Sequence, residues 1–163
     1  MTVIDLVKDP ESLTMTITAE FDANPARVWQ LWADPRQLER WWGPPGYPAT
    51  FVDHELLPGT MIRYFMTTPE GERLWGWWKV RSVEAPHRLE FEDGFADDKG
   101  DPNPEMPVGV AVITIESIGD TRSRMLMENH FPSTEAMEQV LAMGMEEGIK
   151  AAMGQIEAIL AAG

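Results

Sequence analysis

Residues 133–160 read STEAMEQVLAMGMEEGIKAAMGQIEAIL and contain no proline. Ser133 is a good helix N-cap, and apolar residues recur after it at steps of three or four positions, which predicts one long amphipathic helix. The apolar stripe comprises Met137, Leu141, Met145, Ile149, Met153, Ile156 and Leu160. At 1.5 Å per residue this helix would be roughly 40 Å long. It therefore needs an apolar surface of similar length against which the stripe can pack.

The rest of the chain supplies that surface as strands. Residues 12–22 alternate apolar and polar side chains, which is typical of a half-buried strand. Six further strands are predicted between turn-forming residues, at 49–57, 60–67, 73–84, 88–95, 108–118 and 121–131. Two short helices are predicted after the first strand, one beginning at Pro25 and one containing Trp41. The fold class is therefore α+β, with a curved seven-stranded antiparallel sheet around a long C-terminal helix.

Length and composition narrow the class of protein. A chain of 163 residues with 44% hydrophobic residues fits one domain, assigned to residues 12–163, with residues 1–11 as an N-terminal extension. The absence of cysteine excludes disulfides and cysteine-based metal sites. A net charge of −14 disfavours nucleic acid and anionic lipid as partners. Residues 1–10 lack a long apolar run, so we expect no membrane insertion and a cytoplasmic protein.

Motifs for cofactor, metal or nucleotide chemistry are missing. The chain has no glycine-rich phosphate loop, nucleophile elbow or dinucleotide fingerprint, so no cofactor is expected. Its histidines, His54, His87 and His130, form no helical pair with a carboxylate at metal-ligand spacing, so no metal site is expected. The acidic loop at 96–107 lacks the alternate-residue spacing of a calcium loop.

Aromatic residues and methionines are the candidates for a ligand site. Strand alternation places Tyr64 and Met66 on one face, and it groups Trp75 with Trp77 and Phe91 with Asp93 and Phe95. A β-bulge would invert any of these assignments. The predicted ligand-binding residues are Trp42, Tyr64, Met66, Trp75, Trp77, Phe91, Phe95, Met127, Met145, Ile149 and Met153.

Two glycines in the predicted helix need a physical reason. Gly144 and Gly148 lie four positions apart and so share a helix face, and each costs about 1 kcal/mol relative to alanine in a helix interior. One interpretation is close packing of the helix against the sheet or a neighbouring side chain. The other is room for a ligand beside Met145, Ile149 and Met153. The sequence leaves both open.

Several stretches resemble the helix-grip superfamily, also called START-like or SRPBCC, in its branch related to the activator of the heat-shock-protein-90 ATPase. They span residues 12 to 161 and comprise Val28-Trp29, Asp34-Pro35, Arg40-Trp41-Trp42-Gly43-Pro44, Pro58-Gly59, Trp75-Gly76-Trp77-Trp78-Lys79-Val80, Pro86 with Arg88-Leu89, Asp93-Gly94-Phe95-Ala96-Asp97 and Gly144-Met145-Glu146-Glu147-Gly148. The resemblance implies an interior cavity and functions that range from ligand binding through polyketide cyclisation, hydrolysis and lyase chemistry to chaperone stimulation. Fold alone does not choose among them.

Three functions are consistent with these observations. The first is binding of a small hydrophobic or aromatic ligand between sheet and helix, oriented by the Tyr64 hydroxyl. The second is a cavity enzyme of the polyketide cyclase or lyase type, with acid–base catalysis by His54, Asp93, Glu128 or His130 and with Tyr64 as hydrogen-bond donor. The third, less favoured because the chain has no further domain to hold a large ATPase, is regulation of a chaperone. The sequence leaves open whether the chain forms a homodimer.

Overall fold

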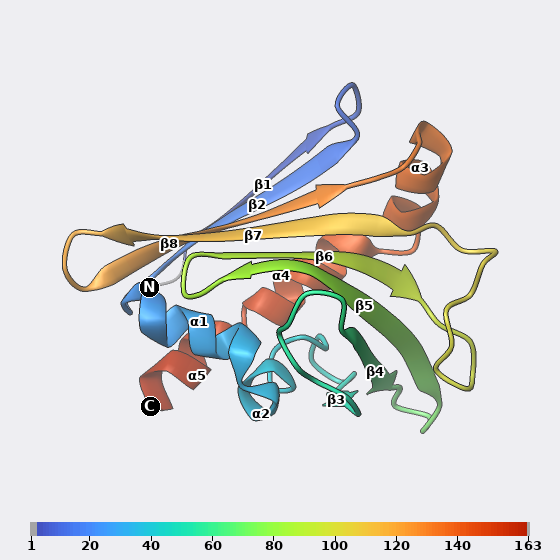
Figure 1. Ribbon diagram of the computed structural model, residues 1–163, viewed down its shortest axis with the longest axis horizontal. Coiled ribbons are helices and arrows are strands. Elements are labelled where there is room, and N and C mark those ends of the chain that lie inside the picture. The colour runs from blue at the N-terminus through green and yellow to red at the C-terminus, as the bar shows by residue number, and fades with distance from the viewer. Residues whose placement is uncertain (1–2, 163) are drawn as a thin grey trace.

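The computed structural model describes residues 3–162 and contains one antiparallel sheet with helices along its concave side (Figure 1). The sheet order is β1-β2-β8-β7-β6-β5-β4-β3. Its strands are β1 (Val3–Asp9), β2 (Thr14–Phe21), β3 (Ala49–Phe51), β4 (Met61–Thr67), β5 (Arg73–Glu84), β6 (Arg88–Phe95), β7 (Gly109–Ile118) and β8 (Arg122–His130). The helices are α1 (Pro25–Ala33), α2 (Pro35–Leu38), α3 (Thr134–Ala142), α4 (Met145–Met153) and α5 (Ile156–Ala162). The predicted α+β fold, with a curved antiparallel sheet around a C-terminal helical segment, is confirmed.

The first of the two short helices begins where the sequence predicts, at Pro25, whereas the second, predicted to contain Trp41, ends at Leu38. The Asn24 side chain accepts a hydrogen bond from the backbone N–H of Arg27, and Pro25 occupies the first helical position of α1. The Asp34 side chain then caps α2 by accepting from the backbone N–H of Arg36. These two helices cover one end of the sheet, and α5 packs beside α1 at the same end (Figure 1).

The sheet has one strand more than the predicted seven. Residues 3–9, which the sequence analysis assigned to an N-terminal extension, form β1 and pair antiparallel with β2. Ile4 and Leu6 of β1 pack against the core, which gives this edge strand an apolar inner face. The predicted strand 49–57 is shorter than expected, because regular pairing with β4 ends at Phe51.

The C-terminal helical segment is divided into three helices. Gly144 adopts a left-handed backbone conformation with φ of 88° and separates α3 from α4, so it does not lie in a helix interior as predicted. A second break follows Gly154, where the Gln155 side chain donates to the backbone oxygen of Gly43 at 2.7 Å. The predicted apolar stripe is nevertheless kept along all three helices, because its residues all pack against the core. No helix within residues 3–162 is long and apolar enough to cross a bilayer.

Aromatic rings fill the concave face beneath α1 and α2. The Trp32 ring lies 4.8 Å from that of Trp41 and 6.2 Å from that of Phe91, measured between ring centroids. Trp78 stacks on Phe91 at 4.1 Å, and both side chains are fully buried. We call Trp32, Trp41, Trp42, Trp78 and Phe91 the aromatic cluster. It closes this end of the sheet by direct packing.

Candidate functional site

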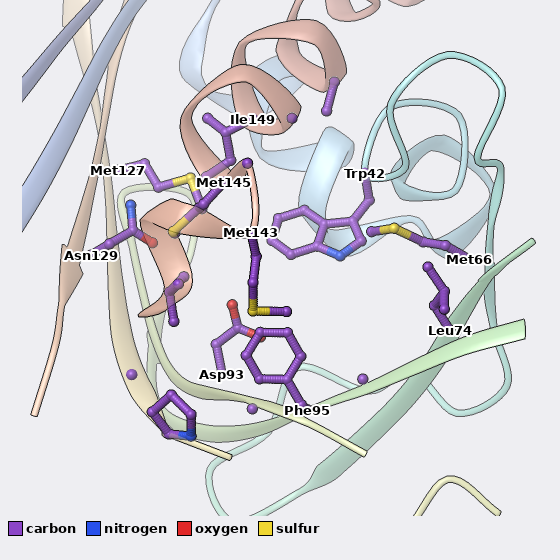
Figure 2. Close-up of a pocket in the computed structure, with 18 of the residues that line it drawn as sticks. Trp42, Met66, Leu74, Asp93, Phe95, Met127, Asn129, Met143, Met145 and Ile149 are labelled. Atoms are coloured by element: carbon purple, nitrogen blue, oxygen red, sulfur yellow. The ribbon is translucent and has the colours of Figure 1, made fainter. Parts of the chain in front are cut away.

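A cavity of about 330 Å³ lies at the other end of the concave face, between β4–β8 and the helices α3 and α4 (Figure 2). Small-molecule sites in proteins usually enclose about 300–1,000 Å³, so this volume suits a small ligand. Its lining is mostly apolar, with methionines from both the sheet and the helices. Leu74 and Met143 line the cavity and are also 51% and 56% exposed, so apolar side chains form part of its rim.

Most of the predicted ligand-binding residues surround this cavity. Strand β4 contributes Tyr64 and Met66, and Trp42 comes from the segment after α2. The complete set of predicted residues that line the cavity is Trp42, Tyr64, Met66, Trp75, Phe95, Met127, Met145, Ile149 and Met153. Figure 2 shows Trp42 and Met66 on one side of the cavity and Met127, Met145 and Ile149 on another.

Trp77 and Phe91 lie outside the cavity, contrary to prediction. In the β5 register Trp78, not Trp77, is paired with Ile62 of β4 and with Asp93 of β6, so Trp78 shares their face. Trp77 lies on the opposite face, where its indole N–H donates to the backbone oxygen of Phe95 at 3.0 Å. Phe91 is on the concave face but is buried beneath Trp78 in the aromatic cluster.

Trp75, like Trp77, lies on the outer face of β5. Its ring packs 4.9 Å from that of Phe65, although the residue contributes to the edge of the cavity. The sequence prediction that Trp75 and Trp77 face inward is therefore wrong for their strand face. Gly76 and Trp78 occupy the inward positions of this stretch instead.

Asp93 places a carboxyl group in this apolar cavity. It lies opposite Trp78 of β5 and Gly109 of β7, and Figure 2 shows its carboxyl group beside Phe95 and Met143. Among residues 3–162 nothing forms a hydrogen bond or ion pair with this carboxyl group, and the half-buried Asp93 lines the cavity. Burial raises the pKa of Asp93 from 3.8 to about 7.

Tyr64 supplies the second polar group. Its ring stacks on Phe51 at 5.0 Å and meets Trp42 edge-on at 6.1 Å. Burial, together with the nearby Asp93 carboxylate, raises the pKa of Tyr64 above its ordinary value, so the hydroxyl is neutral across the physiological range. Gly76 makes room for it, because a Cβ at that position would lie 2.5 Å from the Tyr64 hydroxyl oxygen.

The indole rings of Trp42 and Trp78 lie next to the tyrosine ring, with centroids 6.1 Å and 6.0 Å from it. Trp42 and Trp78 are close enough to lower the pKa of Tyr64 against the larger effect of burial. Neither Nε1 atom, however, has a hydrogen-bond partner of good geometry among the described residues, and both atoms are buried. Buried donors without a partner are uncommon in native proteins, which marks this region for a functional explanation.

The other catalytic candidates do not face the cavity. The His54 ring donates through Nε2 to the backbone oxygen of Trp32 at 2.9 Å, and burial lowers the pKa of His54, which favours the neutral ring. Glu128 alternates with Met127 and Asn129 and so occupies the outer face of β8. His130 contributes to the cavity edge, but its strand position is outward and the residue is exposed. The structure therefore brings together only Tyr64 and Asp93 from this set.

The two helix-region glycines leave open space. Both line the cavity, and a Cβ built on either Gly144 or Gly148 would meet no heavy atom within 4 Å. Close packing therefore does not explain either glycine. Gly144 is required by its left-handed backbone, whereas Gly148 is within α4 and has no such requirement.

Asn129 is a site residue that the sequence analysis missed. It lines the cavity beside Met127, is 5% exposed, and donates through Nδ2 to the backbone oxygen of Met15 at 3.3 Å. The signal was present in the sequence, because Asn129 continues the inward alternation of Met125 and Met127 with a polar side chain. Within the described part of the chain, no cluster of three His, Asp or Glu side chains could hold a metal ion.

Comparison with known structures gives close relatives. The chain is 48% identical to a protein from Arthrobacter aurescens with a TM-score of 0.92, over 98% of this chain and 92% of that chain. It is 47% identical to a protein from Mycobacterium smegmatis with a TM-score of 0.89, over 97% of each chain. An AHSA1 protein from Silicibacter pomeroyi, 22% identical with a TM-score of 0.71 over 91% of this chain and 97% of that chain, shares the fold.

A family model supplies the remaining comparison. None of the curated proteins matches the chain. The model described as "Activator of Hsp90 ATPase homolog 1-like protein" matches residues 22–161, which cover α1 to α5 and every strand except β1 and β2. Because this match covers most of the chain, the protein belongs to the Activator of Hsp90 ATPase homolog 1-like family, within the helix-grip superfamily.

Proposed function

We propose that this protein binds a small, largely apolar ligand in the cavity between its sheet and α4. The observation that carries the proposal is unfilled space beside Gly148. Protein interiors are normally close-packed, so an apolar cavity of about 330 Å³ in an otherwise well-filled concave face requires a reason. Binding of a ligand supplies one.

Gly148 strengthens this interpretation because the glycine has an energetic cost and no local structural need. A glycine within a helix is less stable than alanine by about 1 kcal/mol. At this position an alanine Cβ would contact nothing within 4 Å, so neither a close helix–sheet approach nor the backbone conformation excludes it. A ligand that occupies the space beside α4 would explain why the side chain is missing.

A second candidate function is acid–base catalysis on a ligand held in the same cavity. Asp93 favours it, because a carboxyl group with a pKa of about 7 can donate or accept a proton near neutral pH. Of the titratable residues among the described lining residues, Tyr64 is buried and Asp93 is half-buried, whereas His130 is exposed. An elimination or cyclisation in this cavity would therefore depend on Asp93, and Asp93→Asn would abolish turnover while leaving ligand binding in place.

Dye binding by matched variants of α4 tests the proposed function. The neutral fluorescent dye N-phenyl-1-naphthylamine would be titrated into the wild-type protein, Gly148→Phe and Ala151→Phe. Gly148 lines the cavity, whereas Ala151 is exposed on the same helix. We expect the wild-type protein and Ala151→Phe to bind the dye alike, and Gly148→Phe to bind at least about tenfold more weakly because its ring fills the cavity. Equal binding by all three proteins, or by none, would contradict cavity binding.

A further inference from the structure

The polar groups of the cavity are few and lie close together. Tyr64 lies opposite Gly76 of β5, and Asp93 lies opposite Trp78, the next inward residue of the same strand, so both line the same part of the cavity. The Asp93 carboxylate also raises the pKa of Tyr64. The described residues that line the cavity include no lysine or arginine, and the other titratable one, His130, is exposed on the outward parity of β8. Gly76 and Gly109 on the strands beside Asp93, and Met143 and Met145 from the helical segment, bring no charge. The polar end of the cavity therefore depends on two side chains.

The indoles next to Tyr64 do not take up its hydroxyl proton. The rings of Trp42 and Trp78 lie 6.1 Å and 6.0 Å from that of Tyr64, measured between ring centroids, and an indole N–H donates and does not accept. Among residues 3–162 the Tyr64 hydroxyl donates to no acceptor, so its proton is available. Tyr64 lines the cavity, and its hydroxyl lies beside Gly76, which lines the cavity too. This tyrosine is arranged as a hydrogen-bond donor to whatever occupies the cavity.

Asp93 can donate in the same way when it is protonated. Its carboxyl group faces the cavity and has no hydrogen-bond or ionic partner among the described residues. Burial favours the neutral acid, and a neutral carboxylic acid in an apolar site can donate a hydrogen bond to a ligand oxygen.

We propose that the Tyr64 hydroxyl and the Asp93 carboxylic acid form a pair of hydrogen-bond donors that binds the carbonyl oxygen of an uncharged aromatic or alicyclic ligand. This inference rests on the proposed ligand-binding function and specifies the chemistry of the ligand. The apolar lining holds the hydrocarbon part, while the donor pair fixes its one polar atom.

Other polar ligands fit these groups less well. A carboxylate ligand would find no lysine or arginine among the described lining residues to balance its charge. An ammonium ligand would require Asp93 to be ionised in a site that favours the neutral acid. A carbonyl oxygen accepts from both groups without introducing charge.

Three ligands with one carbon skeleton test this inference: 2-acetylnaphthalene, 2-ethylnaphthalene and 1-(2-naphthyl)ethylamine. Their affinities would be measured at pH 6 by displacement of N-phenyl-1-naphthylamine from the wild-type protein, Tyr64→Phe, Asp93→Leu, Asp93→Asn and Tyr47→Phe. The last is a matched control, because Tyr47 is exposed and outside the cavity. The informative quantity is the ketone affinity divided by the hydrocarbon affinity, which cancels general changes in the cavity.

We expect Tyr64→Phe and Asp93→Leu each to lower this ratio by roughly fivefold to tenfold, the usual effect of one hydrogen bond. Asp93→Asn keeps a donor and should retain most of the ratio, and Tyr47→Phe should leave it unchanged. Between pH 6 and pH 8.5 the ratio should fall in the wild-type protein, because Asp93 loses its proton, but not in Asp93→Asn.

The possible failures are distinguishable. A ratio that neither Tyr64→Phe nor Asp93→Leu changes would overturn the donor pair while leaving apolar ligand binding intact. Stronger binding of the amine, lost in Asp93→Asn, would overturn it in favour of a cation site. Failure of all three ligands to displace the dye, or of the dye to bind, would remove the proposed function and the donor pair with it. A carboxyl ¹³C NMR titration adds an independent readout, in which Asp93 ionised throughout pH 5–8 would also overturn the proposal.

Discussion

The two ends of the concave face differ, although the same strands build both. On β5, Trp78 points into the aromatic cluster, and two residues earlier Gly76 presents no side chain to the cavity. On β6, Phe91 is sealed beneath Trp78, and two residues later Asp93 faces open space. On each strand, neighbouring inward-facing residues therefore belong to different ends of the concave face, one to the filled end and the next to the hollow end. The cavity results from the choice of side chains on a continuous sheet, not from a gap in the backbone.

The largest expected effect tests whether the filled end carries more of the stability. Trp32→Ala should lower the free energy of unfolding by about 3–5 kcal/mol, because it removes a fully buried ring packed against other rings of the aromatic cluster. Met145→Ala, at the hollow end, should cost no more than about 1–2 kcal/mol because its side chain already borders empty space. Urea denaturation of both variants would measure the difference. Equal losses would mean that the two ends are packed alike.

A pH-dependent effect of somewhat smaller size is expected at Asp93. Its pKa is about 7 in the folded protein and 3.8 when unperturbed, so the folded state binds the proton more tightly. Stability is therefore lost as the pH rises from about 4 to about 7, and the full cost of ionisation applies above that range. Asp93→Asn should raise the free energy of unfolding by about 2–4 kcal/mol at pH 8.5 and change it little at pH 4. Denaturation curves at the two pH values would check this, and a pH-independent effect would contradict a raised pKa.

Alanine substitutions of the glycines around the cavity should change the free energy of unfolding by about 1 kcal/mol, and the sign shows where the hollow end has space. Gly148→Ala should stabilise the protein by about that amount, because the new methyl group meets open space within a helix. Gly76→Ala should instead destabilise it, since its Cβ would lie 2.5 Å from the Tyr64 hydroxyl. Thermal unfolding of the two variants, with Gly119→Ala at an exposed turn as a reference for positive φ, would measure the signs. A loss of stability in Gly148→Ala would refute the open space beside α4, and a gain in Gly76→Ala would refute the close contact with Tyr64.

The smallest expected effect concerns the contact between the edge strand and α4. The Lys8 ammonium lies 3.1 Å from the Glu146 carboxylate, and both side chains retain solvent exposure. Lys8→Ala should therefore lower stability by no more than about 0.5–1 kcal/mol, and the loss should vanish at high salt. Unfolding measured at low and high ionic strength would test it. A larger, salt-independent loss would show that Lys8 stabilises β1 by packing and not by charge.

Sequence periodicity predicted those strands in which a single face is apolar. The strand predicted at 12–22 is present as Thr14–Phe21, because its apolar residues alternate with polar ones throughout. The strand β1 was missed because Leu6 and Val7 are adjacent apolar residues and interrupt the alternation of apolar and polar side chains, although Ile4 and Leu6 do pack inward. In Trp75-Gly76-Trp77-Trp78, tryptophans occupy both faces, so alternation could not decide which face is inward. The inward face became clear only from the pairing of Gly76 with Tyr64.

The site was predictable in its members more than in its geometry. Asp93 lies between Phe91 and Phe95 in the alternation, and a polar residue at an apolar position is visible in the sequence. The space beside Gly148 was a hypothesis from the sequence, but a period of three or four residues contains no information about volume. The two indole donors near Tyr64 depend on contacts among β4, β5 and the segment after α2, which no local pattern encodes.

The aromatic cluster also has an optical consequence. Trp42 lies 5.8 Å from Trp32, 5.6 Å from Trp41 and 4.9 Å from Trp78, and it also lines the cavity. Excitation energy passes readily between indoles at such separations, so light absorbed by any of the four is shared among them. A quencher bound in contact with Trp42 would reduce the fluorescence of all four tryptophans, while Trp75 and Trp77 on the outer face would give a background emission. The protein thus contains an intrinsic fluorescence reporter whose sensing element is at the wall of the ligand space.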